Sequence, residues 1–122
     1  MTSLHETSRR LRLLIAHMAR HPDLPEVRHL GTTYGPEDLE ITVDGDGTAK
    51  FLAWCASLDQ PRVRVVGSSG PGLAMLWCRG FIRGDMVQLD AHVADLPELG
   101  EWSEPMPLIG FCHVLINSGW RP

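Results

Sequence analysis

The chain has 122 residues, of which 43% are hydrophobic and 21% are charged, and its formal net charge is −4. This length and balance predict one soluble folded domain that spans residues 1–122 and encloses one modest core. A general nucleic-acid binder would carry a positive excess, so we expect no nucleic-acid partner. The start of the chain has no apolar signal segment, and no apolar run reaches the roughly 20 residues of a membrane helix. We therefore expect a cytoplasmic protein with no membrane partner.

Residues 3–20 carry the pattern of an amphipathic helix. Ser3 and Glu6 have the spacing of a capping box, and Pro22 follows the end of the pattern. With about 100° between successive residues, the apolar side chains share a stripe that we expect to pack on the core: Leu4, Leu11, Leu14, Ile15 and Met18. The opposite side carries charged residues and one leucine: Arg9, Arg12, Arg20 and Leu13. A leucine on a charged face indicates a contact site, although a single exposed leucine is also normal.

The rest of the chain alternates between strand and helix patterns. Residues 26–31 and 38–43 are predicted strands joined by a Gly-Pro turn, and residues 47–58 are a predicted helix. Residues 62–66, 72–82 and 86–93 follow as three strands, the last two joined by the turn sequence IRGD, and residues 94–107 are an acidic loop. Residues 108–118 fit either a helix or a buried strand. The Asn-Ser-Gly ending, with Gly119 near the C-cap, favours the helix.

This order predicts the α+β class, in the sequence α-β-β-α-β-β-β-α. The strands come in hairpins and are not separated by long crossovers, so we expect an antiparallel sheet of about five strands with the helices packed on one face. On residues 86–93, the pattern places Val87, Leu89, Ala91 and Val93 on one side of the strand, and Met86, Gln88, Asp90 and His92 on the other.

Two glycine-rich stretches resemble ligand loops but lack essential parts. In VDGDGTAKFLAW (43–54), the calcium-loop register puts Ala53 where a bidentate glutamate is required, so we expect a turn followed by a helix that Asp46 caps. In GSSGPG (67–72), Pro71 removes an N–H group that a phosphate loop would use, and a strand follows where a helix is needed. We expect this second stretch to be a hairpin connection.

No metal, cofactor or catalytic residue is predicted. The three cysteines, Cys55, Cys78 and Cys112, lie far apart in apolar patterns, so we expect them to be reduced. Cys78, His92, Cys112 and His113 lack the spacing of zinc ligands. The histidines, serines and acids form no recognisable catalytic motif, so a role other than that of an enzyme is favoured.

A resemblance covers roughly residues 15–66. The run HPDLPEV, the alternating strand after it and the run FLAWCASL together resemble small uncharacterised α+β proteins of actinobacteria and their mobile elements. The residues that carry the likeness are of structural types: Leu24, Pro25, Leu52, Ala53, Trp54 and Leu58. The resemblance implies no activity and no catalytic residue. The tripeptide HPD (21–23) also resembles the J-domain signature, but no second helix follows it.

Two classes of function stay open. The favoured one is a non-catalytic protein-interaction module that self-associates as a homodimer or larger homo-oligomer, or that binds another protein. It rests on the arginine-rich helix, the acidic segment 85–104, and two tryptophans outside the periodic patterns. Its candidate interface residues are Arg9, Arg12, Leu13, Arg20, Trp102 and Trp120. The alternative is a small-ligand or enzymatic cleft on the sheet face, with His29, Gln88 and His92 as candidate lining residues.

Overall fold

The structure is a computed structural model of the chain, and it describes residues 4–31, 39–43, 47–70, 73–94 and 104–121. These residues form, in chain order, α1 (Leu4–Arg20), β1 (Val27–Gly31), β2 (Leu39–Val43), α2 (Thr48–Ala56), β3 (Asp59–Gly70), β4 (Leu73–Ile82), β5 (Asp85–Val93), β6 (Met106–Pro107) and α3 (Leu108–Asn117). The expected α+β class is confirmed, and residues 108–117 are helical as favoured. No helix in the described ranges is long and apolar enough to cross a membrane.

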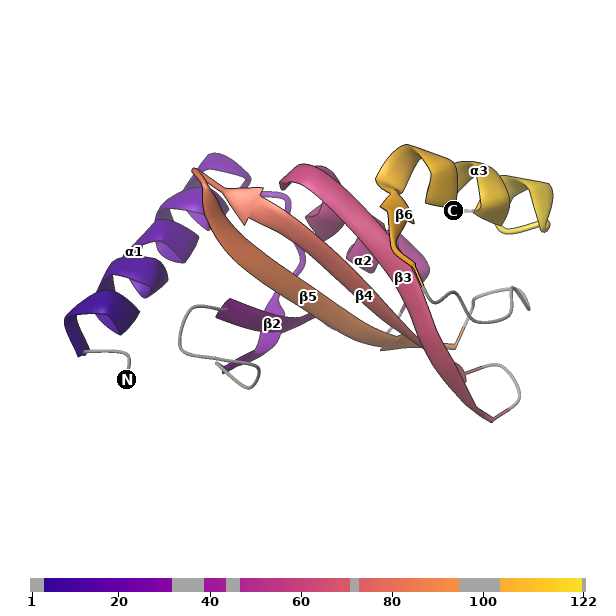
Figure 1. Cartoon of the computed structure of the whole chain (residues 1–122), viewed down its shortest axis with the longest axis horizontal. Helices are drawn as coiled ribbons and strands as arrows, with labels where there is room; N and C mark the ends of the chain where they lie inside the picture. The colour runs from indigo at the N-terminus through magenta and orange to yellow at the C-terminus, as the bar shows by residue number, and fades with distance from the viewer. Residues whose placement is uncertain (1–3, 32–38, 44–46, 71–72, 95–103, 122) are drawn as a thin grey trace.

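The sheet is mixed and six-stranded, in the order β1-β2-β5-β4-β3-β6 (Figure 1). β2 pairs in parallel with β5, and the other neighbouring pairs are antiparallel. The predicted antiparallel sheet of about five strands therefore matches only roughly. Two parallel strands need a long crossover, and here α2, β3 and β4 supply it between β2 and β5. The predicted loop 94–107 contains the short strand β6, and β3 extends to Gly70 in the predicted connection 67–72.

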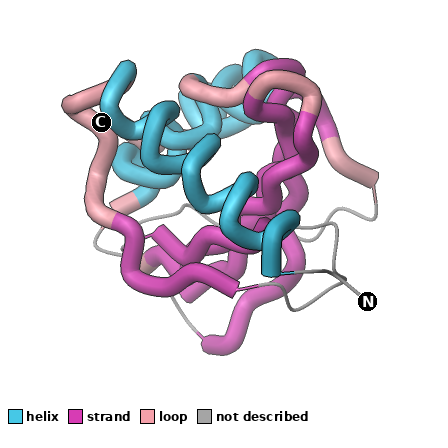
Figure 2. The backbone as a smooth tube through the Cα atoms, turned by 90° about the vertical axis from the view of Figure 1, so that its left-hand side faces the viewer, coloured by secondary structure: helices cyan, strands magenta, loops and turns pink. Residues whose placement is uncertain are grey.

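The helices and the sheet share one hydrophobic core. Each helix contributes buried residues to it: Leu14 from α1, Phe51, Trp54 and Cys55 from α2, and Phe111 and Leu115 from α3. The sheet contributes alternate residues of its strands: Ile41, Val63, Val65, Leu76, Cys78, Leu89, Ala91 and Val93. Figure 2 shows the helices gathered on one side of the curved layer of strands. The core faces predicted for residues 86–93 and 47–58 are confirmed. The expected residues of β5 are buried, as are Trp54, Cys55 and Leu58.

The predicted packing face of α1 is only partly correct. Leu14 and Met18 of the expected stripe contact the core, but Leu11 and Ile15 do not pack there. Leu14 and His17 are buried, whereas Leu11 is 37% and Ile15 is 65% exposed. The buried face of the helix is therefore rotated by roughly a quarter turn from the apolar stripe, at about 100° per residue. Polar contacts explain the difference, because His17 Nε2 lies 2.9 Å from Ser57 Oγ and Arg9 pairs with Asp85. The spacing of apolar residues along the helix does not predict these contacts.

Two local predictions are confirmed in detail. The β4–β5 hairpin turns at Arg83 and Gly84, which have φ angles of 49° and 84°, as a two-residue type I′ turn requires. At the end of α3, Gly119 has a φ of 94°. Its N–H group donates to Ile116 O, and the N–H group of Trp120 donates to Leu115 O. This pattern is a Schellman motif, in which glycine adopts the left-handed conformation at little cost.

One expected cap falls outside the described residues. The sequence predicts that Asp46 caps α2, but the structure does not describe residues 44–46. The N-cap position of α2 is Gly47, which has no side chain that could cap the helix.

Candidate functional site on the polar face of the sheet

The strand residues that point away from the core form a second face, which we call the polar face. Residues directly opposite one another in the sheet register lie on the same face, so the pairs define rows across the strands. One row, the Asp90 row, runs from β1 to β3 through His29, Thr42, Asp90, Trp77 and Arg64. The sheet therefore brings together five polar or aromatic side chains that the chain order separates.

The adjacent row, the Gln88 row, runs from β2 to β3 through Glu40, Gln88, Arg79 and Arg62. Arg79 Nε donates to Gln88 Oε1 at 3.1 Å. Gln88 is only 2% exposed, and its Nε2 has no hydrogen-bond partner among the described residues. A buried N–H group without a partner costs about 1–3 kcal/mol. The Gln88 row therefore holds an unused donor at its centre.

Asp90 and Glu40 form a carboxyl pair at the point where β5 meets β2. The side chain of Asp90 hydrogen-bonds to both Glu40 and Thr42. The pKa of Asp90 is raised to about 6. Burial is the main cause, and the hydrogen bond to Glu40 is the second. Two carboxyl groups can hydrogen-bond to each other only if a proton lies between them. Between pH 3.8 and about 6, this pair therefore holds a proton that an isolated aspartate would have lost.

The other side of the polar face is basic. Arg62 and Arg79 are opposite one another on β3 and β4, and the Arg64 guanidinium lies 5.0 Å from the centroid of the Trp77 ring. None of these arginines makes an ion pair with a described carboxylate. The polar face is therefore divided, with carboxyl groups over β2 and β5 and guanidinium groups over β3 and β4.

The three residues proposed from the sequence as cleft-lining all lie on this face. Gln88 is in its centre, His29 is exposed on the edge strand β1, and His92 is exposed on β5 opposite Met75. The sequence reasoning missed the residues that surround Gln88: Glu40, Thr42, Arg62, Arg64, Trp77, Arg79 and Asp90. The alternation on residues 86–93 already placed Asp90 beside Gln88 and His92. The carboxyl partner on β2 required the parallel pairing, for which the sequence carried no signal.

The candidate interface residues do not form one described surface. Arg9 donates to the Asp85 carboxylate of the same chain through Nη1 at 3.0 Å and Nη2 at 2.9 Å, and this contact is the main cause that lowers the pKa of Asp85. Arg12 and Arg20 are exposed, and Leu13 is half-buried. Trp120 packs against the core, whereas Trp102 lies outside the described residues. Whether any of them contacts a partner stays a prediction.

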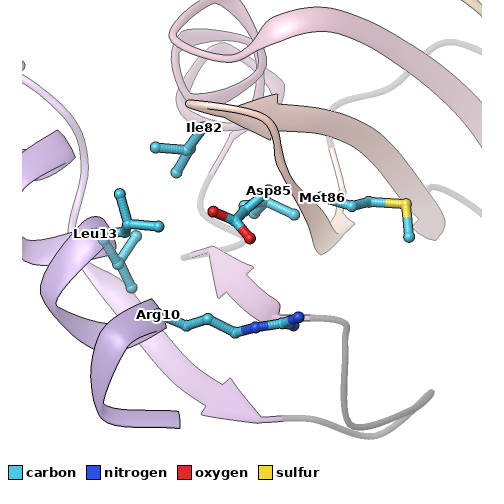
Figure 3. Close-up of a pocket in the computed structure, with 7 residues that line it drawn as sticks. Arg10, Leu13, Ile82, Asp85 and Met86 are labelled. Carbon is cyan, nitrogen blue, oxygen red and sulfur yellow. The ribbon is translucent and has the colours of Figure 1, made fainter. Parts of the chain in front are cut away.

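Leu13 lines a small pocket between α1 and the β4–β5 hairpin (Figure 3). In this view Leu13 and Ile82 face one another, and the carboxylate of Asp85 is directed toward α1. The pocket has a cavity volume of about 10 Å³, which is about the space of one water molecule. It is therefore a packing gap rather than a ligand site, and Leu13 serves the contact between helix and hairpin.

A wider depression lies where α1 meets α2, and it includes the HPD tripeptide. Its volume is about 360 Å³, and its polar lining residues are Arg20, His21, Asp23 and Ser57. Ser57 Oγ donates to Trp54 O at 2.7 Å, so the hydroxyl accepts from His17 Nε2. Burial is the main cause that lowers the pKa of His17, which favours a neutral ring. Because the Ser57 proton is held by a carbonyl oxygen and not by a base, this pair does not form an activated nucleophile.

The cysteines are unpaired, and they lie close to one another in the core. Cys55 and Cys78 are buried, and Cys112 is half-buried. Burial and a hydrogen bond to Cys78 raise the pKa of Cys55, and burial raises that of Cys112. A thiol with a raised pKa is a poor nucleophile at neutral pH. No group of three or more potential metal ligands occurs within the part of the chain that the structure describes.

Comparison of the chain with protein-family models, with curated proteins and with solved structures finds no match.

Proposed function

We propose that this protein is a small-ligand-binding domain and that its ligand lies on the polar face, over Gln88 and Asp90. The observation that carries the proposal is the burial of these two side chains, which are 2% and 6% exposed, on the face turned away from the core. A strand whose outer face served only to meet water would carry fully solvated residues there. Burying polar groups without complete hydrogen bonding costs stability, and folds keep such costs mainly at functional sites.

The chemistry of the face supports a polar ligand. Within the two rows, a carboxyl pair, an amide and guanidinium groups lie on neighbouring strands. These groups come from the sheet and not from loops, so their relative positions are held by backbone hydrogen bonds. Such an arrangement suits recognition of a ligand that carries both hydrogen-bond donors and acceptors.

The test is a map of where small polar probes bind. We expect at least one of acetate, inorganic phosphate, acetamide and methylammonium, followed by amide NMR, to shift resonances of residues 88–90 and their neighbours on β2 and β4. Gln88→Leu should abolish these shifts, because leucine keeps the size of the side chain but has no amide. Met86→Leu, on the same strand and face, should preserve them. Shifts confined to the Arg20–Ser57 depression, or absent with every probe, would contradict the proposal.

The second candidate is the predicted self-association, and a feature of α3 favours it. Ile109 is 72% exposed and Ile116 is 64% exposed, and they lie on the same side of the helix about two turns apart. Packing of this side of α3 on a second copy would cover both isoleucines. Sedimentation should then show a wild-type dimer and a monomeric Ile116→Lys variant. A wild-type protein that stays monomeric at high concentration would exclude this candidate.

A further inference from the structure

We infer that the β3–β4–β5 part of the polar face is a binding site for a small oxyanion, such as a phosphate or carboxylate group. The site comprises four residues, Arg62, Arg64, Arg79 and Gln88, which we call the arginine subsite. The inference rests on the proposed function and names the chemical class of its ligand.

The first argument is the placement of like charges. Arg62 and Arg79 are direct partners across β3 and β4, and side chains at such positions have Cβ atoms about 4.5–5.5 Å apart. Arg64 follows Arg62 by two positions, so it lies on the same face. Like charges directly opposite one another destabilise a sheet, and no described carboxylate pairs with these three. An anion bound between the three guanidinium groups would be attracted by each of them and would offset their mutual repulsion.

The second argument is the set of unused hydrogen-bonding groups. Arg79 uses its Nε atom to hold Gln88 Oε1, which leaves the amide Nε2 of Gln88 buried without a described partner. Arg64 Nε is also buried and without a described partner. Both unused atoms are donors. The buried acceptor atom Glu40 Oε2 lies on β2, outside the arginine subsite. Within the subsite the unused atoms are donors, which fits an oxyanion rather than a cation.

The third argument is preorganisation. The hydrogen bond to Gln88 holds Arg79, and the ring of Trp77 lies against the guanidinium of Arg64 at 5.0 Å. Arginine is suited to oxyanions because its planar fork presents two parallel N–H groups to two oxygens. Side chains that are already held lose less conformational entropy when the ligand binds.

The carboxyl pair on β2 and β5 repels an anion, whereas the arginines attract it. The distances to the two groups decide which effect is larger. Neighbouring strands are about 4.8 Å apart, so Asp90 on β5 lies one strand from Arg79, whereas Glu40 lies two strands from it. The strand of Asp90 lies roughly 10 Å from β3, which carries Arg62 and Arg64. Charges that far apart near the surface are largely screened at physiological salt, where the Debye length is about 8 Å. An anion in direct contact with guanidinium groups is therefore attracted. We place it over β3 and the adjoining side of β4, away from Asp90 and Glu40.

The experiment is a titration with sodium sulfate, sodium phosphate and sodium acetate at constant ionic strength, followed by amide NMR. We expect saturable shifts at residues 62–64, 77–79 and 88. The variant Arg64→Gln/Arg79→Gln should weaken binding at least tenfold. The control Arg28→Gln/Arg83→Gln removes the same charge from exposed positions on β1 and the β4–β5 turn, and it should bind as wild type does. Thermal melts check that each variant is folded.

The probes and variants separate the possible results. Preference for phosphate and sulfate over acetate would assign a phosphate-type ligand, and the reverse would assign a carboxylate; either supports the inference. Equal loss in the control variant would show general electrostatic attraction and overturn it. If acetamide or methylammonium shifts residues 88–90 but no anion binds, the ligand class is wrong and the proposed function stands. If no probe binds this face, both are wrong.

Discussion

Replacement of Asp90 by asparagine should make the protein more stable at neutral pH. The pKa of Asp90 is raised from 3.8 to about 6, because the carboxylate is buried and hydrogen-bonds to Glu40. The folded state therefore holds the proton more tightly than the unfolded state. The stabilising contribution of protonated Asp90 is full below pH 3.8 and is lost as the pH rises through 6. An asparagine side chain keeps the size and the hydrogen-bonding ability of the protonated acid at every pH.

The magnitude follows from the difference between the two pKa values. At about 1.4 kcal/mol per pH unit, a rise from 3.8 to about 6 has an upper bound of about 3 kcal/mol. Residual solvation and sharing of the proton with Glu40 reduce this value. We therefore expect the Asp90→Asn variant to gain about 1–2 kcal/mol in free energy of unfolding above pH 6, and to lose that advantage below pH 3.8.

Urea unfolding followed by tryptophan fluorescence across this pH range is the assay, and Asp85→Asn is the matched control. The expected change in stability of this control is opposite to that of Asp90→Asn. Arg9 lowers the pKa of Asp85, so the ionised Asp85 stabilises the folded state at neutral pH. That variant should lose up to about 1 kcal/mol at neutral pH, since both partners are partly exposed, and nothing in acid. An Asp90→Asn variant that is less stable than wild type at neutral pH would refute the reasoning. The carboxylate would then make net favourable contacts in the folded state.

Three substitutions test the packing. Gly80→Ala should cost about 1–3 kcal/mol in thermal or urea unfolding, because its Cβ would lie 2.7 Å from the Cβ of Leu58, an atom that cannot turn away. Gly110→Ala should instead add about 0.5–1 kcal/mol, since it lies in α3 and its Cβ would meet only Met106 Sδ, at 3.8 Å; equal effects of the two would contradict the close approach at β4. Trp54→Phe should cost about 2–4 kcal/mol, because it leaves a gap in the core and removes the 2.8 Å hydrogen bond to the Pro25 carbonyl. An unchanged urea midpoint would show that this contact adds nothing.

The stability gain expected for Asp90→Asn also bears on the proposed function. A side chain that lowers stability at neutral pH is a candidate for a functional role, because proteins break local rules mainly at functional sites. If the asparagine variant is more stable but no longer responds to the probes that bind wild type, the cost of Asp90 is explained by ligand binding. If it is more stable and binds equally well, the ligand is held by the arginine subsite and Gln88 alone.

The sequence by itself determined the features that depend on neighbours along the chain. Alternation on residues 86–93 separated the core side of β5 from the side that carries Gln88 and Asp90, because successive strand residues point to opposite faces. Turn chemistry located the β4–β5 hairpin and the glycine at the end of α3, because few residues adopt a positive φ. The α+β class also followed, since hairpins and helices were recognisable separately.

Only the tertiary structure decided which strands are neighbours and which helix face is buried. The parallel pairing of β2 with β5 brings Glu40 and Thr42 to Asp90, and nothing within either segment specifies that pairing. Apolar spacing placed Ile15 inward, yet the ion pair of Arg9 and the contact of His17 with Ser57 turn α1 otherwise. The spacing of apolar residues shows which face of a helix or strand is able to pack on a core. Strand pairing and polar contacts with distant segments decide which face is buried in the folded protein. The polar face arises from that selection, because its two rows join residues from strands that are far apart in the sequence.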